Sequence, residues 1–278
     1  MPEKTFYDEI VECLRLTRRG TPAVTVSEEV MKEFMTDIPR RPSAEPEAPE
    51  TSYIPPAPVS PADPVNPPPA ASPAGMSLSK GFSAADIAGM NWEELSAAVA
   101  GCRACKLCTT RKNTVFGSGN REAKLLFFGE GPGADEDAQG LPFVGRAGEL
   151  LTKMINAMQF SREEVFICNT IKCRPPNNRN PEPDETEACR AYAERQIELV
   201  KPEVIVILGS VALRFLFPNV YGGIRSLRGK WLEYRGIKVM PTYHPAYLLR
   251  NPASKAETWK DLQQVMTCFG KNPQPRRH

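Results

Sequence analysis

Four short apolar blocks alternate with helical patterns through the second half of this 278-residue chain. The blocks are residues 124–129, 165–169, 204–209 and 237–241, and the helical patterns are residues 147–158, 184–200, 210–217 and 254–269. Strands that alternate with helices form a parallel sheet that is covered on both faces. The chain is therefore predicted to be an α/β protein, a three-layer α/β/α sandwich with a central, mostly parallel, four-stranded sheet.

The first 80 residues differ in composition from the rest. Apolar positions at helical spacing in residues 4–36 predict a short helical segment within residues 1–38. Residues 39–73 hold 13 prolines, and such a stretch buries too little apolar surface to offset the entropy of ordering it. We therefore expect a helical segment (1–38), a disordered proline-rich linker (39–80) and a folded domain (81–278). The linker is interpreted as a spacer, with the binding of a protein partner as the alternative.

Charge is distributed unevenly along the chain. Residues 1–76 carry a net charge of −5 and the remaining residues carry +7, which gives the overall +2. A basic body favours a polyanionic partner, although many enzymes carry as much charge. No apolar run approaches the roughly 18 residues of a membrane helix, and the chain begins without a hydrophobic signal region. These features predict a cytoplasmic protein that is not secreted.

In a parallel α/β sheet, ligands bind beyond the carboxyl ends of the strands, so the loops after the apolar blocks are the candidate site. The first block leads into a glycine-rich loop (GEGPG, 129–133), Asn169 ends the second, and His244 follows the fourth. Glycines let the backbone approach a ligand, an asparagine amide offers a donor and an acceptor, and Phe143 offers a ring for stacking. Each feature also has a purely structural interpretation, as a tight turn, a capping amide or a core ring.

Cysteine spacing points to a metal centre. Cys102 and Cys105 form a CxxC pair that Cys108 extends to CxxCxxC, while Cys173 and Cys189 lie far along the chain. A chain without a secretory signal keeps its cysteines reduced, so metal binding or buried thiols are favoured over disulfides. Zinc accepts four thiolates, and an iron–sulfur cluster is also held by four. Spacing alone leaves the metal open.

Together these motifs resemble the family 4, iron–sulfur-containing uracil-DNA glycosylases. The resemblance covers roughly residues 90–270. The matching motifs, in chain order, are CRAC at 102–105, GEGPGADED at 129–137, GLPFVGRAGELL at 140–151, NTIKCRPPNNRNPEPDE at 169–185 followed by Cys189, and HPAYLLRNP at 244–252. Residues 1–80 lie outside it.

The resemblance implies the α/β/α fold and a [4Fe–4S] cluster with a structural role. The implied ligands are Cys102, Cys105, Cys173 and Cys189. Cys108 would then be a near neighbour of the cluster, and Cys13, Cys168 and Cys268 would be non-ligands.

The resemblance also implies a uracil-binding site. The residues that would form it are Gly129, Glu130, Gly131, Phe143, Asn169 and His244. A base must leave the stack before it is cut, and the flipped uracil would stack on Phe143 while Asn169 pairs with its O4 and N3–H edge. Cytosine presents the opposite pattern and would be rejected. His244 would face O2 and stabilise the negative charge that develops as the bond breaks.

The residue that positions the attacking water is less obvious. The best-known uracil glycosylases have an Asp where this chain has Gly131, and family 4 lacks it too. Glu130 is the nearest carboxylate in sequence, with Asp135 and Asp137 as further options. A related branch traps the sugar covalently through a His in an insert after the glycine loop. This chain has no His there, so turnover rather than trapping is expected.

Beyond His244, the resemblance makes Leu248 and Arg250 candidates for a DNA wedge and a phosphate contact. The expected protein is a monomeric, monofunctional glycosylase, located with the nucleoid, that leaves an abasic site in single- or double-stranded uracil-containing DNA. One alternative is a catalytically weak iron–sulfur module that binds nucleic acid or assists a DNA polymerase. Another is a thiolate-zinc DNA-binding protein.

Overall fold

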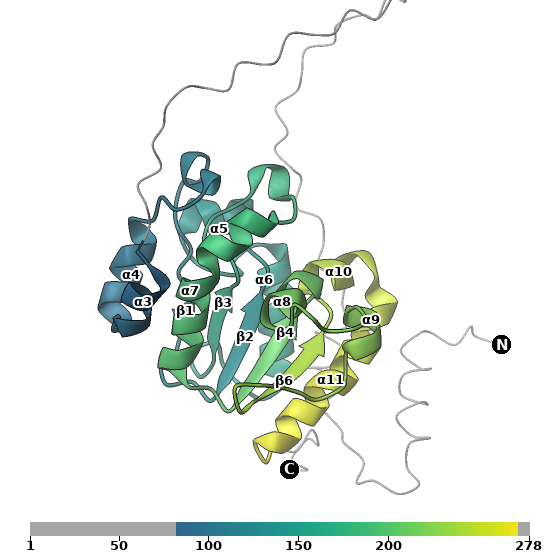
Figure 1. The fold of residues 1–278 in the computed structure, drawn as a ribbon. Helices are drawn as coiled ribbons and strands as arrows, with labels where there is room; N and C mark the ends of the chain where they lie inside the picture. The colour runs from purple at the N-terminus through teal and green to yellow at the C-terminus, as the bar shows by residue number, and fades with distance from the viewer. Residues whose placement is uncertain (1–81, 272–278) are drawn as a thin grey trace, which may run out of the picture. The chain divides into compact units, whose positions relative to one another are not determined.

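The computed structural model describes residues 82–271 of the chain (Figure 1). The predicted helical segment (1–38) and proline-rich linker (39–80) lie outside the described residues, as do Cys13 and His278. Within the described range, the helices are too short or too polar to cross a membrane.

A six-stranded sheet lies at the centre of this domain, in the order β1-β3-β2-β4-β6-β5. Its inner strands are β2 (Leu125–Gly129), β3 (Phe166–Asn169), β4 (Val204–Leu208) and β6 (Ile237–Thr242), which pair in parallel and confirm the four predicted strands. Two antiparallel edge strands, β1 (Ser118–Gly119) and β5 (Leu232–Tyr234), extend the sheet beyond the four strands expected. None of their residues is fully buried, so they carry no apolar block that the sequence could reveal.

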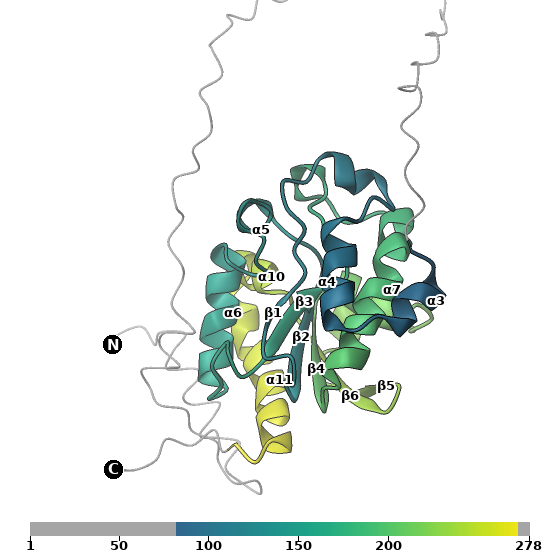
Figure 2. The same cartoon turned by 90° about the vertical axis from the view of Figure 1, so that its left-hand side faces the viewer.

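Alternate residues of the inner strands pack on opposite faces of the sheet. Leu125 and Phe127 join one apolar cluster, and Leu126 and Phe128 join the other, because successive side chains of a strand point to opposite sides. The first face is covered by α6 (Arg146–Ala157), α10 (Pro245–Arg250) and α11 (Lys255–Cys268), and the second by α7 (Pro183–Val200) and α8 (Ser210–Leu216). Figure 2 shows α6 and α11 on one side of the sheet and α7 on the other, which confirms the three layers.

Two short helices, α3 (Ala84–Gly89) and α4 (Trp92–Ala100), pack against α7. Each begins at a capping residue, Ser83 or Asn91, whose side chain accepts a backbone N–H from the first turn. Trp92 meets the ring of Phe166 edge-on at 5.3 Å, which fixes α4 to the sheet. The CxxC segment and the turn η1 (Lys106–Thr109) follow α4 directly, so this packing also holds them against the domain.

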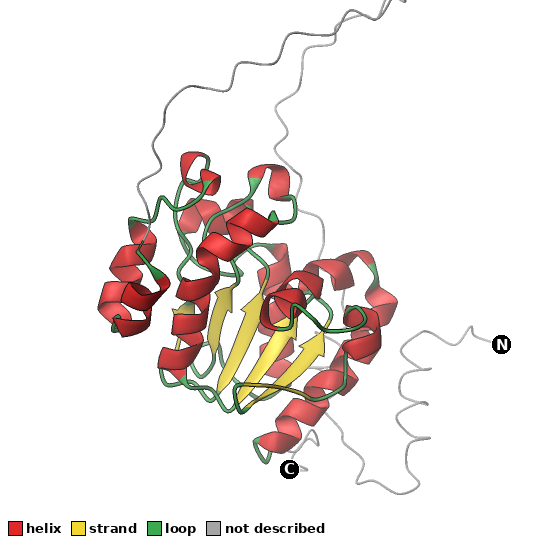
Figure 3. Cartoon of the chain, viewed as in Figure 1, coloured by secondary structure: helices red, strands yellow, loops and turns green. Residues whose placement is uncertain are grey.

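The inner strands all end at the same edge of the sheet (Figure 3). Short helical elements lie in the loops: α5 (Ala134–Gln139), η2 (Pro176–Asn178), α9 (Ile224–Leu227) and η3 (Pro252–Ser254). The chain runs from β2 to β3 on one side of β2, but from β4 to β6 in the other direction. Such a reversal opens a crevice at the carboxyl ends of the strands, and here it lies between β2 and β4.

Candidate functional site

A cleft of about 480 Å³ opens at this edge of the sheet. Its lining includes most of the residues predicted for the uracil site, together with one predicted DNA contact: Glu130, Gly131, Phe143, Asn169, His244 and Arg250. These residues come from the loops after β2, β3 and β6, which the sequence pattern had placed at one edge. The loop after Cys173, at residues 175 and 178–181, forms another wall. The predicted site residues are therefore brought together.

Gly129, the last residue of β2, packs closely against Asn169 and Phe143. A Cβ atom at this position would come 2.4 Å from Oδ1 of Asn169 and 2.7 Å from Cζ of Phe143, distances at which atoms overlap. Only glycine lets the strand, the amide and the ring meet so closely.

Asn169 is held in place, but the oxygen of its side-chain amide makes no hydrogen bond to another described residue. The residue is 1% exposed, and the buried Nζ of Lys172 donates a 2.6 Å hydrogen bond to its backbone carbonyl. Its side-chain Oδ1 has no hydrogen-bond partner among the described residues. A buried polar atom without a partner is costly. Oδ1 of Asn169 is therefore an acceptor without a donor in the described part of the chain, in a residue that lines the cleft.

Phe143 adopts a left-handed backbone conformation, with φ of 52°. Gly148 permits this turn, because a Cβ there would come 1.9 Å from the carbonyl oxygen of Phe143. The buried carboxylate of Glu136 accepts hydrogen bonds from the N–H groups of Gly133, Val144 and Gly145 at 2.9–3.0 Å. It thereby ties the glycine loop to the segment that carries Phe143.

Sequence reasoning missed Glu136. Its signal was an acidic residue three positions after Gly133, at the start of a helix, which is the spacing of a capping carboxylate. The carboxylate of the neighbouring Asp137 also has a structural role, because its Oδ1 accepts a hydrogen bond from the N–H of Lys112 at 2.8 Å. Asp135, in contrast, is exposed and lines the cleft.

His244 is held by the helix that it begins. The N–H of Ala246 donates a 3.1 Å hydrogen bond to Nδ1 of His244, so the neutral ring carries its hydrogen on Nε2. Burial, with a smaller effect from the charge of Arg250, lowers the pKa of His244 to about 4. The imidazole is therefore neutral at pH 7, with its Nε2 hydrogen left for a group in the cleft.

Glu130 stands at the edge of the same cleft. Its side chain is half-buried, and burial raises the pKa of its carboxyl group. Its backbone carbonyl accepts the N–H of Ile171 at 3.2 Å and the hydroxyl of Thr170. The loop after β2 is thus fastened to the loop after β3.

The structure contradicts the role predicted for Leu248. This residue is 0% exposed and belongs to the apolar cluster that joins α10 to α6 and α11. A side chain enclosed in the core does not reach between DNA bases. Arg250, two residues later, is exposed and lines the cleft, and its contact with a DNA phosphate stays a prediction.

A second, smaller cavity lies between the CxxC segment, the loop after β3 and α7. Its lining includes Cys102, Cys105, Cys108, Cys173 and Cys189, all of which are free thiols. Burial raises the pKa of Cys173 to about 11 and that of Cys189 to about 12. The other described cysteines lie elsewhere: Cys168 is inside the core on the second face of the sheet, and Cys268 is exposed at the end of α11.

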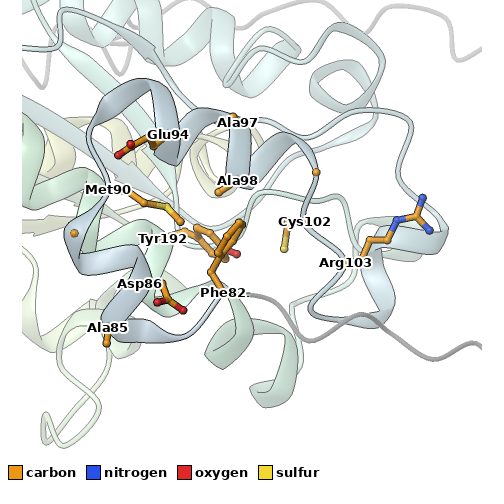
Figure 4. Close-up of a pocket in the computed structure, with 12 residues that line it drawn as sticks. Phe82, Ala85, Asp86, Met90, Glu94, Ala97, Ala98, Cys102, Arg103 and Tyr192 are labelled. Carbon is orange, nitrogen blue, oxygen red and sulfur yellow. The ribbon is translucent and has the colours of Figure 1, made fainter.

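A larger groove of about 1300 Å³ runs beside α3 and α4 (Figure 4). Apolar residues such as Phe82 and Met90 line much of it, and Cys102 and Tyr192 are shared with the cysteine cavity. None of the predicted uracil-binding residues lines it. The groove is therefore separate from the cleft at the strand ends.

Known proteins match the same part of the chain. A type-4 uracil-DNA glycosylase of Thermotoga maritima is 48% identical over 164 residues, covering 59% of this chain and 85% of the relative. A type-4 uracil-DNA glycosylase of Saccharolobus solfataricus is 45% identical over 180 residues, or 62% and 83% of the two chains. A DNA polymerase of Bacillus phage SP01 is 30% identical over 159 residues, 56% of this chain but 17% of the polymerase. A sequence model of the uracil DNA glycosylase superfamily matches residues 116–263, more than half of the chain, and the chain belongs to that family.

Proposed function

We propose that this protein is a uracil-DNA glycosylase, which hydrolyses the N-glycosidic bond of uracil in DNA and leaves an abasic site for base excision repair. The observation that carries the proposal is the unpartnered Oδ1 of buried Asn169, a residue that lines the same cleft as the ring of Phe143 and the neutral imidazole of His244. The membership of the chain in the uracil DNA glycosylase superfamily supports this activity over that of a zinc-binding protein or an accessory module.

The flipped base would be recognised by its edge and its face. Oδ1 of Asn169 would accept N3–H of uracil, and the amide nitrogen would donate to O4. Cytosine carries an amino donor and an unprotonated N3 there, so it would leave Oδ1 without a donor. A site built to form such a hydrogen bond discriminates strongly against a base that lacks it. Phe143 would stack on the base, and this contact would offset part of the free energy needed to unstack the base from DNA.

His244 would act on the leaving group. Its Nε2–H would donate a hydrogen bond to O2 of uracil, where negative charge grows as the glycosidic bond breaks. Because the ring is neutral and its Nδ1 is held by Ala246, it acts as a fixed donor rather than a proton source. Removing a fixed donor of this kind typically costs about 100- to 1000-fold in rate.

Glu130 is the carboxylate that we assign to the attacking water. Burial raises its pKa towards the range in which a carboxylate accepts a proton readily. The departing base leaves a sugar with oxocarbenium character, so the water needs positioning more than strong activation. Asp135 is the second carboxylate on the cleft, and Asp137 is engaged with the backbone.

We also propose a [4Fe–4S] cluster in the cysteine cavity, held by Cys102, Cys105, Cys173 and Cys189. The donor set fits, because these four cysteines, from distant parts of the chain, line one space together with Cys108. Among the described residues, no three His, Cys, Asp or Glu side chains are arranged for a single metal ion. The role of the cluster would be structural, because hydrolysis transfers no electrons.

The proposal is tested on full-length protein with a uracil-containing oligonucleotide and a cytosine-containing control. Alkali-labile cleavage of the uracil strand alone, single- or double-stranded, is the expected result. Visible absorbance and iron content test the cluster separately, since zinc is colourless. We further propose that the protein acts as a monomer at the nucleoid and that its proline-rich linker is a spacer, with the binding of a protein partner as the alternative.

The second candidate is an iron–sulfur module that binds nucleic acid or assists a DNA polymerase. The similarity to a segment of a phage DNA polymerase favours it. If iron-loaded protein bound uracil-containing DNA but released no uracil, this function would replace the glycosylase.

A further inference from the structure

Arg111 bridges the two parts of the chain that carry the cysteines. Its Nη1 donates a 3.0 Å hydrogen bond to Sγ of Cys173, in the loop after β3. Its Nη2 donates a 2.7 Å hydrogen bond to the backbone carbonyl of Cys102, in the CxxC segment. The side chain lines the cysteine cavity and is partly buried. One guanidinium group therefore links both sides of the cavity.

The guanidinium group suits this position. Its planar fork holds two acceptors at a fixed separation, and it keeps its positive charge at any ordinary pH. A charged donor makes a stronger hydrogen bond than a neutral one, and its acceptor here is a sulfur that would carry negative charge as a cluster ligand. Lys172 is the other cation on the cavity, but its Nζ donates to Asn169 and Gln196. Arg111 is thus the cation directed at a ligand sulfur.

We propose that Arg111 is a positioning residue for the iron–sulfur cluster. It holds the Cys102 and Cys173 segments at the separation that the cluster requires, and its hydrogen bond stabilises the charge on the sulfur of Cys173. Partners outside the ligand set typically change metal affinity by about 10- to 100-fold. Hydrogen bonds to ligand sulfurs also raise the reduction potential, because the reduced cluster carries more negative charge. This inference rests on the cluster of the proposed function.

Two variants of the full-length protein, Arg111→Gln and Arg111→Lys, test the positioning role of Arg111. Arg103→Gln is the matched control: it removes the same charge from the same segment, but Arg103 is exposed and points away from Cys102 (Figure 4). The measurements are iron per protein, the rate at which visible absorbance disappears in the presence of a chelator, and the reduction potential of the bound cluster.

The expected result is cluster loss about 10-fold faster or more in Arg111→Gln than in wild type, with a lower reduction potential. Arg111→Lys should lie between them, because an ammonium group keeps the charge but cannot reach both acceptors as a fork. Arg103→Gln should match wild type. Circular dichroism shows whether each variant folds; if Arg111→Gln does not, the Lys variant decides by the same comparison.

Equal loss rates and potentials in wild type, both Arg111 variants and the control would overturn the role of Arg111 while leaving the cluster in place. Wild-type protein reconstituted with iron and sulfide that still held no iron would overturn the cluster itself, and Arg111's role with it. Uracil excision by such iron-free protein would show that the glycosylase proposal stands without either.

Discussion

The ring of Phe143 lies 5.7 Å from the imidazole of His244, with the two planes inclined by 35°. The two side chains come from loops that follow different strands, β2 and β6, and Asn169 reaches the same cleft from the end of β3. The space between ring, imidazole and amide is therefore set by three separate strand ends. A small displacement of any one of these strand ends should change which molecules the cleft binds.

Gly129→Ala tests this directly. The added Cβ would overlap Oδ1 of Asn169 and the ring of Phe143, so one or both must move. A displacement of about 1 Å at a reacting site can lower a rate about 100-fold, and we expect that loss in single-turnover uracil excision.

Gly89→Ala is the control for that change. Its Cβ would meet no atom within 4 Å among the described residues, and alanine at the end of helix α3 should leave excision unchanged. Wild-type excision by Gly129→Ala would show that the close packing of Gly129 does not position the amide and the ring.

Leu248→Ala distinguishes a core residue from a DNA wedge. Because Leu248 is fully enclosed, its truncation should lower the free energy of unfolding by about 2–5 kcal/mol. Excision per folded molecule should stay near wild type below the unfolding temperature. Leu249→Ala, at a partly buried neighbour, should cost less stability. Unchanged stability combined with lost excision would instead support the wedge.

The sequence predicted the inner strands and the cleft well, because both follow from strong local patterns. Buried parallel strands appear as continuous apolar blocks, and the rule on strand ends then places the glycine loop, Asn169 and His244 together. Shorter elements escaped. The two edge strands carry too few buried residues to be seen, and the sequence of helix α10 was grouped with the loops at the strand ends.

That missed helix explains the error at Leu248. In α10, Pro245 and Leu248 lie three residues apart, so they share the face that packs on the core, and both are buried. Arg250 falls on the opposite, exposed side. The available signal was the pair His244-Pro245, a capping residue followed by proline at the first helical position. Arg111 escaped for a different reason, because its hydrogen bond to Cys173 joins positions that are 62 residues apart in the sequence.

The pKa of His244 gives a prediction about acid stability. Its value in the folded protein, about 4, lies below the ordinary 6.5, so between these pH values the unfolded chain binds a proton that the folded chain does not. The free energy of unfolding should therefore fall as the pH falls from 6.5 to 4, by at most about 3 kcal/mol from this residue.

In His244→Gln that contribution disappears, and the decline over this pH range should be shallower. Denaturant unfolding of wild type and variant at matched pH values measures the difference. Identical pH profiles would mean that His244 is not held as a neutral, buried ring.

The central claim, that the buried amide of Asn169 reads uracil, is tested most directly by single-turnover uracil release from DNA by iron-loaded wild type and Asn169→Ala. The affinity of each for abasic DNA is measured beside it. Wild type should release uracil and leave cytosine in place, and Asn169→Ala should be at least about 100-fold slower. Both should bind abasic DNA equally, because that product has no base to read. Uracil release by Asn169→Ala at the wild-type rate would contradict the account.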